Sequence, residues 1–148
     1  MKQNLFQSPI KIWYKVLPGR GKVIWPILDI KISYQRNILP QPVLALIDSG
    51  ANRSIIHPLL AEALGFNPDK LGDPERGVSA SGDYKSWTLP KMNINIYGYE
   101  FSLPFTVIDN KNLIWPCILG EDSIFQFARL DFQKFKGFLE IRFRSDIN

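Results

Sequence analysis

Cysteine and histidine are almost absent from this sequence, which contains one of each, Cys117 and His57, in 148 residues. A single cysteine excludes a disulfide framework within the chain and a zinc site built from several cysteines. Any histidine-based metal centre or serine–histidine–aspartate triad would depend on His57 alone. We interpret His57 as a surface or capping residue at the start of a helix rather than as a catalyst. Cys117 lies between Pro116 and Ile118, and we interpret it as a small core residue.

Long hydrophobic runs are also missing. No stretch approaches 18 uninterrupted apolar residues, which argues against a transmembrane helix. The first 15 residues are broken by polar side chains and lack the apolar core of a secretory signal peptide. Hydrophobic residues make up 45% and charged residues 22% of the chain, a globular rather than a disordered balance. We therefore expect a cytoplasmic protein without a membrane partner.

A concentrated charge of one sign is the third feature that the sequence lacks. Eighteen basic and fourteen acidic residues leave a net charge of +4, and the basic residues are scattered in ones and twos. The densest group, Arg142 and Arg144, is too small for a nucleic-acid footprint. We expect no nucleic-acid partner.

The sequence is rich in β-strand patterns. Apolar and polar residues alternate over residues 28–34, 92–96 and 139–143, the period of a half-buried strand. Residues 43–47 are continuously apolar, as expected for a strand covered on both faces. Residues 101–108 read as a further strand that returns after a turn. The last strand is expected to pair with residues 129–132 through a turn near Gly137.

Two segments are expected to be helical. Residues 57–64 place Pro58 early and end at Gly65, a typical start and stop. Residues 121–128 begin with acidic side chains, which favour the first turn of a helix. Eleven prolines and ten glycines spread along the chain fit short strands joined by turns. We expect one mainly β domain over residues 1–148.

One short motif carries chemistry. The apolar strand at residues 43–47 leads directly into Asp48, Ser49, Gly50 and Ala51. An aspartate followed by a serine and a glycine is by itself a common turn. The context makes the motif more specific, because a predicted helix follows it and a second apolar run ends at Gly120.

These residues resemble the retropepsin-like aspartic proteases, a single-domain family. Its catalytic loop is similar to residues 46–51, and its second signature, two apolar residues and a glycine before a short helix, is similar to residues 118–120. Residues 77–83 are the candidate for the family's glycine-containing flap hairpin. The resemblance covers a core of about residues 23–144. It implies a mainly β fold, a closed or partly open β-barrel of retropepsin type with one or two short helices.

The resemblance implies an aspartic endopeptidase that acts on a peptide or protein substrate without a metal or cofactor. Asp48 is then the catalytic residue, and Ser49 and Gly50 form its supporting loop. Two neighbouring carboxylates share one proton, so one can act as base and the other as acid. The residues expected to bind substrate are Ala51, Asn52, Gly77, Val78, Ser79, Ala80, Ser81 and Gly82.

The Asp-Ser-Gly sequence occurs only once, although two carboxylates are needed. The second must come from another copy, which predicts a twofold homodimer with Asp48 opposite its own copy. Two alternatives remain open. The chain could be a catalytically silent retropepsin fold that binds peptides or dimerises, or an unrelated β-barrel with a chance motif.

The charges beside the two signatures depart from the family pattern. Retroviral members often carry acidic residues after the catalytic loop and an arginine after the second glycine. This chain has Arg53 after the loop and Glu121 after Gly120, the reverse arrangement. If the two segments are adjacent, Arg53 and Glu121 are positioned to form an ion pair.

Overall fold

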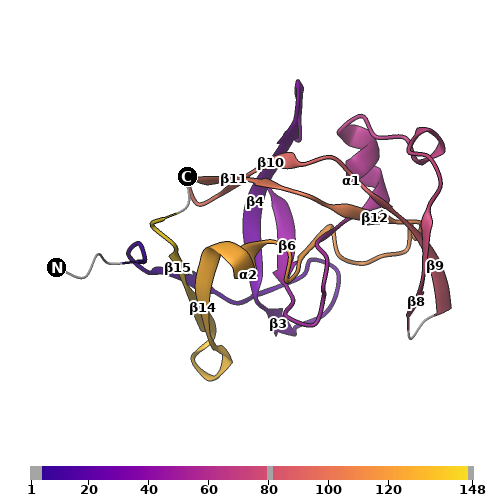
Figure 1. Cartoon of the computed structure of the whole chain (residues 1–148). Helices are drawn as coiled ribbons and strands as arrows, with labels where there is room; N and C mark the ends of the chain where they lie inside the picture. Colours follow the sequence, from indigo (N-terminus) through magenta and orange to yellow (C-terminus); the bar gives the residue numbers. More distant parts are fainter. Residues whose placement is uncertain (1–4, 80–81, 147–148) are drawn as a thin grey trace.

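Strands dominate the computed structural model, which describes residues 5–79 and 82–146 (Figure 1). The helical segments are short: α1 (Pro58–Ala63), α2 (Ile124–Phe127) and the 3₁₀ turns η1 (Pro68–Lys70) and η2 (Lys134–Lys136). The strands are β1 (Ile10–Trp13), β2 (Lys15–Val16), β3 (Ile24–Trp25), β4 (Ile27–Tyr34), β5 (Asn37–Ile38), β6 (Val43–Ile47), β7 (Ile55–Ile56), β8 (Glu75–Ser79), β9 (Gly82–Thr88), β10 (Met92–Ile96), β11 (Tyr99–Leu103), β12 (Thr106–Ile108), β13 (Cys117–Leu119), β14 (Ala128–Gln133) and β15 (Phe138–Phe143).

Most of the strands belong to one curled sheet. Its order is β11-β10-β4-β6-β13-β7-β12-β9-β8, with β5 paired to β4. The sheet forms a half-barrel that carries the two short α-helices, so the expected partly open β-barrel fold is confirmed.

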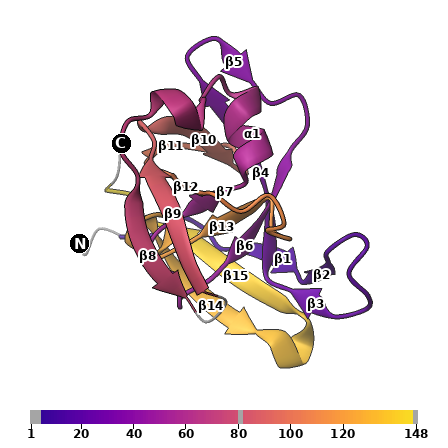
Figure 2. The ribbon, with the colours of Figure 1, turned by 90° about the vertical axis from the view of Figure 1, so that its right-hand side faces the viewer.

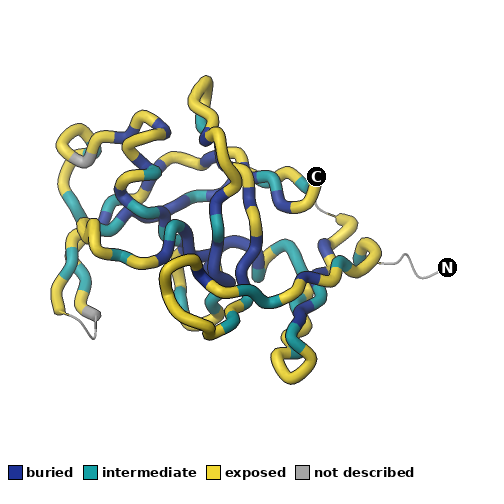
Figure 3. Tube along the Cα trace, turned by 180° about the vertical axis from the view of Figure 1, so that it is seen from behind, coloured by how far each residue is buried: buried dark blue, intermediate teal, exposed yellow. Residues whose placement is uncertain are grey.

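The core follows from the alternation along the central strands. In β4, Ile30 and Ile32 are buried while Asp29 and Lys31 are exposed, as the sequence predicts. The continuous run in β6 is covered on both faces, because Ala45 and Ile47 pack into the main core and Leu46 packs into a second cluster. Figure 3 shows the buried residues concentrated along these central strands.

A separate sheet has the order β1-β15-β14 (Figure 2). The hairpin β14–β15 turns at Gly137, whose φ of +80° is the left-handed conformation that glycine adopts readily. This hairpin matches the sequence prediction. Strand β1 was not predicted, and it pairs antiparallel with β15.

Two expected elements are interrupted. The strand expected over residues 101–108 is divided at Pro104, which has no N–H to donate to a ladder; β11 pairs with β10, whereas β12 pairs with β7 and β9. The helix expected over residues 121–128 is reduced to α2, because residues 121–123 form a turn and Ala128 already begins β14. No helix within residues 5–79 and 82–146 is long and apolar enough to cross a membrane.

Candidate active site

Asp48 lies at the end of β6, where this strand runs parallel to β13. Its backbone N–H donates to the carbonyl of Leu119 (3.0 Å), so the parallel pairing continues into the loop. The Asp48 Oδ1 atom accepts a hydrogen bond from the Gly50 N–H at 2.9 Å. Asp48 is half-buried, whereas Ser49 and Gly50 are exposed. The structure therefore presents the carboxylate in a short, hydrogen-bonded loop at the end of a buried strand.

Gly120 holds the second signature against this loop. A Cβ atom at Gly120 would lie 2.4 Å from the Ala51 carbonyl oxygen and 2.8 Å from that of Arg53. The Glu121 N–H donates to the Ala51 carbonyl at 2.8 Å. The backbones at residues 51–53 and 120–121 thus approach too closely for any side chain at Gly120. This close contact confirms that the two segments are adjacent.

Ser54 connects the same two segments from inside the protein. Its N–H and hydroxyl both donate to Asp122 Oδ1, at 2.8 and 2.7 Å. The Ser54 Oγ accepts from the Gly120 N–H at 3.0 Å and lies 2.8 Å from the Ser123 hydroxyl. Ser54 and Ser123 are fully buried. This cluster, Ser54, Gly120, Asp122 and Ser123, joins residues 66 to 69 positions apart in the sequence.

Sequence reasoning did not identify this cluster. It placed Ser49 in the supporting loop, where the described residues supply no hydrogen bond to its side chain; that role for Ser49 stays a prediction. Within one chain, Ser54 joins the two loops through its hydrogen bonds to Gly120 and Asp122. One sequence feature could have indicated this role for Ser54. It lies directly before two apolar residues, Ile55 and Ile56, in a segment expected to enter the core.

Replacing Ser54 with alanine should lower the free energy of unfolding by about 1–3 kcal/mol, because the Gly120 N–H loses its acceptor and the Asp122 carboxylate loses a donor. Chemical denaturation of Ser54→Ala measures this loss. Ser102→Ala is the control, since Ser102 is exposed on β11 and should change stability by less than about 0.5 kcal/mol. Equal effects of the two substitutions would show that the cluster does not hold the loops together.

The predicted ion pair between Arg53 and Glu121 is not formed. Arg53 instead pairs with Glu75 at the start of β8, with 3.0 Å between Nη1 and Oε2. The Arg53 and Glu75 side chains are 53% and 65% exposed, so the pair contributes only about 0–1 kcal/mol. Its structural consequence is a link between the Asp48 loop and the β8–β9 hairpin.

A pocket of about 400 Å³ lies between this loop and the hairpin. Three residues expected to bind substrate, Ala51, Asn52 and Gly77, line it together although they come from separate segments. The remaining lining residues are Arg53, Ile55, Glu75, Arg76, Tyr84, Ser86, Thr106 and Ile108.

The predicted flap region forms a hairpin, because β8 and β9 pair antiparallel with Gly77 opposite Tyr84. The Tyr84 ring lies across Gly77, where an added Cβ would meet it at 2.3 Å. Val78 is 80% exposed and does not line the pocket beside the Asp48 loop. Gly82 begins β9 and is exposed. The predicted residues Ala80 and Ser81 lie outside the described residues, as does the side chain of Ser79.

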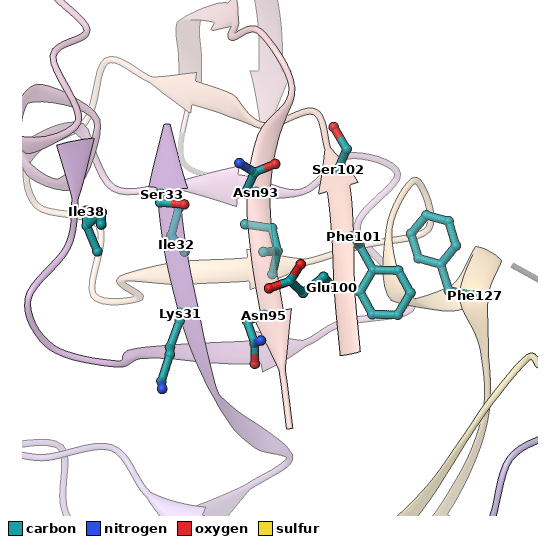
Figure 4. Close-up of a pocket in the computed structure, with 11 residues that line it drawn as sticks. Lys31, Ile32, Ser33, Ile38, Asn93, Asn95, Glu100, Phe101, Ser102 and Phe127 are labelled. Carbon is teal, nitrogen blue, oxygen red and sulfur yellow. The ribbon is translucent and has the colours of Figure 1, made fainter. Parts of the chain in front are cut away.

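Another hollow, of about 570 Å³, lies over the polar face of β4, β10 and β11 (Figure 4). At one end the rings of Phe101 and Phe127 stack with centroids 4.9 Å apart. Its polar side chains belong to the solvated face of an antiparallel sheet; they are Lys31, Ser33, Asn93, Asn95, Glu100 and Ser102. None of the residues predicted for the site lines this hollow.

The two rare residues have the structural roles that the sequence predicts. His57 caps α1, and its Nδ1 accepts a hydrogen bond from the Leu59 N–H at 3.1 Å. Cys117 is fully buried in β13, and burial raises the pKa of its thiol far above the usual range. A buried, protonated thiol is a poor nucleophile.

Comparisons with known proteins agree with this geometry. A model of the protein family described as Aspartyl protease matches residues 35–122, more than half of the chain. A retropepsin-like aspartic protease from Rickettsia conorii superposes with a TM-score of 0.64 at 19% identity, covering 90% of this chain and 98% of that one. The retroviral protease-like domain of Ddi1 from Leishmania major superposes with a TM-score of 0.52 at 23% identity, covering 83% and 91%. No curated protein sequence matches the chain significantly.

Proposed function

The chain belongs to the aspartyl protease family, and we propose that it is a peptide hydrolase whose catalytic residue is Asp48. The observation that carries the proposal is the placement of this carboxylate. Asp48 ends a buried strand and is held by the Leu119 carbonyl and the Gly50 N–H in the loop that the second signature supports.

The chemistry requires two carboxylates. Hydrolysis of a peptide bond by water needs one group to remove a proton from the water and another to protonate the carbonyl oxygen. Two neighbouring carboxylates serve both purposes, because their repulsion favours a state in which they share one proton. A shared proton requires one carboxylate to be ionised while the other is protonated, so we expect activity on the acid side of neutrality.

One chain supplies one Asp-Ser-Gly motif, so the proposed enzyme is a homodimer. A twofold axis beside the loop brings Asp48 of one copy opposite Asp48 of the other. Each copy then supplies Ser49 and Gly50 as the supporting loop. A monomer contains half of the active site.

The substrate-binding surface in this proposal is the pocket between the loop and the β8–β9 hairpin. Ala51, Asn52 and Gly77 line it and contact the peptide. The hairpin serves as the flap that covers the bound peptide and excludes water. Arg53 and Glu75 also line this pocket and form an exposed ion pair between the loop and the hairpin.

Cleavage of an unfolded protein substrate at pH ~4–6 tests the proposal, because a shared-proton pair works on the acid side. The purified chain should cleave, a pepstatin-type inhibitor should block cleavage, and specific activity should fall on dilution through the dimer dissociation constant. Product formation followed by mass spectrometry over a dilution series measures these effects. A folded chain that binds peptides without cleaving them at any concentration would instead be a silent binding module.

A further inference from the structure

The pocket between the catalytic loop and the β8–β9 hairpin has a floor made by neighbouring strands. Figure 2 shows β7, β12, β9 and β8 side by side, in the order in which they pair. Thr106 of β12 lies opposite Ile55 of β7, and both line the pocket. Ser86 of β9 lies opposite Ile108 of β12, and these two line it as well. The floor therefore combines two aliphatic side chains with two hydroxyl groups.

The two hydroxyl groups of the floor have no partner within the described part of the chain. Ser86 is 5% exposed and Thr106 is 6% exposed, yet neither side chain forms a hydrogen bond with another described residue. A buried polar group without a hydrogen bond is costly to the protein. Both hydroxyls are thus available to a polar group that enters the pocket, whereas an apolar group would leave them without a partner.

The charged residues around the pocket have a positive excess. Arg53 and Arg76 line it together with one carboxylate, that of Glu75. Glu75 contacts Arg53 through one oxygen and one nitrogen, 3.0 Å apart, so the rest of the Arg53 guanidinium is open to a ligand. Arg76 forms no ion pair with a described residue. A carboxylate that enters the pocket would meet two cations, one of which has no compensating charge.

We propose that this pocket selects a substrate with an acidic side chain, glutamate or aspartate, close to the scissile bond. The inference rests on the proposed function, because it assigns the pocket to a peptide that the chain cleaves. A carboxylate accepts hydrogen bonds from hydroxyl and guanidinium groups, and its charge strengthens them. An amide of the same shape accepts the same bonds without the charge, and an aliphatic side chain accepts none.

The pocket begins next to the proposed catalytic residue. Ala51 lines it, and the Ala51 N–H donates to the Asp48 carbonyl at 3.2 Å. An extended peptide advances about 3.3 Å per residue, so a side chain within a few positions of the scissile bond reaches the pocket. In the proposed homodimer each copy supplies one such pocket, and a peptide can be read on either side of the bond.

Cleavage of a synthetic peptide library at pH ~6 tests the preference, because a glutamate side chain is ionised at that pH. Products identified by mass spectrometry should show glutamate or aspartate enriched at a fixed position beside the scissile bond. Two peptides that differ only in glutamate or glutamine at that position should then be compared. The glutamate peptide should have a kcat/KM at least about tenfold higher.

Charge reversal at Arg76 tests the assignment to this pocket. Arg76→Glu leaves two carboxylates and one arginine around it, so the preference should pass from the glutamate peptide to a lysine peptide. Arg76 is exposed, so the variant should fold, which thermal unfolding checks. Lys85→Glu is the matched control. Lys85 lies opposite Arg76 in the hairpin and does not line this pocket, so the glutamate preference should persist.

Ser86→Ala tests the floor without a change of charge. The substitution removes one hydroxyl and adds no volume, so kcat/KM for the glutamate peptide should fall at least about fivefold. A peptide with leucine at the same position should be cleaved as well as by the parent chain. Ser102→Ala, on exposed β11, should change neither value.

Binding to Asp48→Asn separates this inference from the proposed function. In fluorescence polarisation the glutamate peptide should bind this variant at least about tenfold more tightly than the glutamine peptide. A parent chain that shows this difference in binding and never cleaves would keep the acidic preference and reject the hydrolase.

The opposite outcomes overturn the inference alone. Equal cleavage of the glutamate and glutamine peptides would do so, as would an Arg76→Glu variant that still prefers glutamate, and the hydrolase would stand in either case. A parent chain that neither binds nor cleaves any peptide of the library would overturn both proposals.

Discussion

Asp48→Asn should abolish peptide hydrolysis while leaving the fold and the dimer intact. Asparagine has nearly the same size, and its Oδ1 can still accept the hydrogen bond from the Gly50 N–H that Asp48 accepts at 2.9 Å. It cannot remove a proton from water, and in a homodimer the substitution removes both carboxylates at once. The rate should fall by at least about 10²–10⁴-fold, the usual contribution of general acid–base catalysis.

The measurement is the rate of peptide cleavage at the acidic optimum, with sedimentation and thermal unfolding of the same sample. Dimerisation should be as tight as in the parent or tighter, because repulsion between like charges across the axis disappears. Asp69→Asn is the matched control, since Asp69 lies in the exposed turn η1, and it should cleave at the parent rate. Cleavage by Asp48→Asn at near the parent rate would rule out the proposed mechanism.

Gly120→Ala should destabilise the protein and disable the site together. The added methyl group would lie 2.4 Å from the Ala51 carbonyl oxygen, so one backbone segment must move away from the other. That movement breaks the hydrogen bond from the Glu121 N–H to Ala51 and the one from the Gly120 N–H to Ser54. We expect a loss of about 1–3 kcal/mol in the free energy of unfolding, as for overpacking a close contact.

A control substitution at a second glycine, Gly98, distinguishes a loss of stability from a displacement of the loop. Gly98 lies in the β10–β11 turn with φ of +89°, and an added Cβ there would meet nothing within 4 Å, so Gly98→Ala strains the backbone without a clash. Compared under conditions where both variants are fully folded, Gly98→Ala should cleave at the parent rate and Gly120→Ala should not. Parent-like stability and activity in Gly120→Ala would show that the loop adapts to a side chain there.

Local patterns in the sequence were sufficient for much of the fold. Alternation predicted β4, β10 and β15 because a strand with one buried face repeats every two residues whatever its partners are. His57 and Gly65 marked the ends of α1 because capping depends on groups within one turn of the helix. These predictions needed no knowledge of the rest of the chain.

Predictions that depended on neighbours distant in sequence were less successful. The strand expected over residues 101–108 was divided, because Pro104 lies where the chain leaves β10 as a partner and joins β7 and β9. Strand β1 was missed, because its place is determined by pairing with β15 at the other end of the chain. The alternation within β1, with Ile10 and Ile12 more buried than Lys11 and Trp13, covers only four residues.

The candidate site divides in the same way. The sequence by itself determined the Asp-Ser-Gly loop at Asp48 and the glycine signature at Gly120, since each is a short motif after an apolar strand. Only the tertiary structure decided that Arg53 pairs with Glu75 instead of Glu121, and that Ser54 and Asp122 join the two motifs. A hydrogen bond or ion pair forms where packing brings side chains within about 3 Å. That distance depends on how the strands are arranged in the sheet, and no pattern within either segment specifies it.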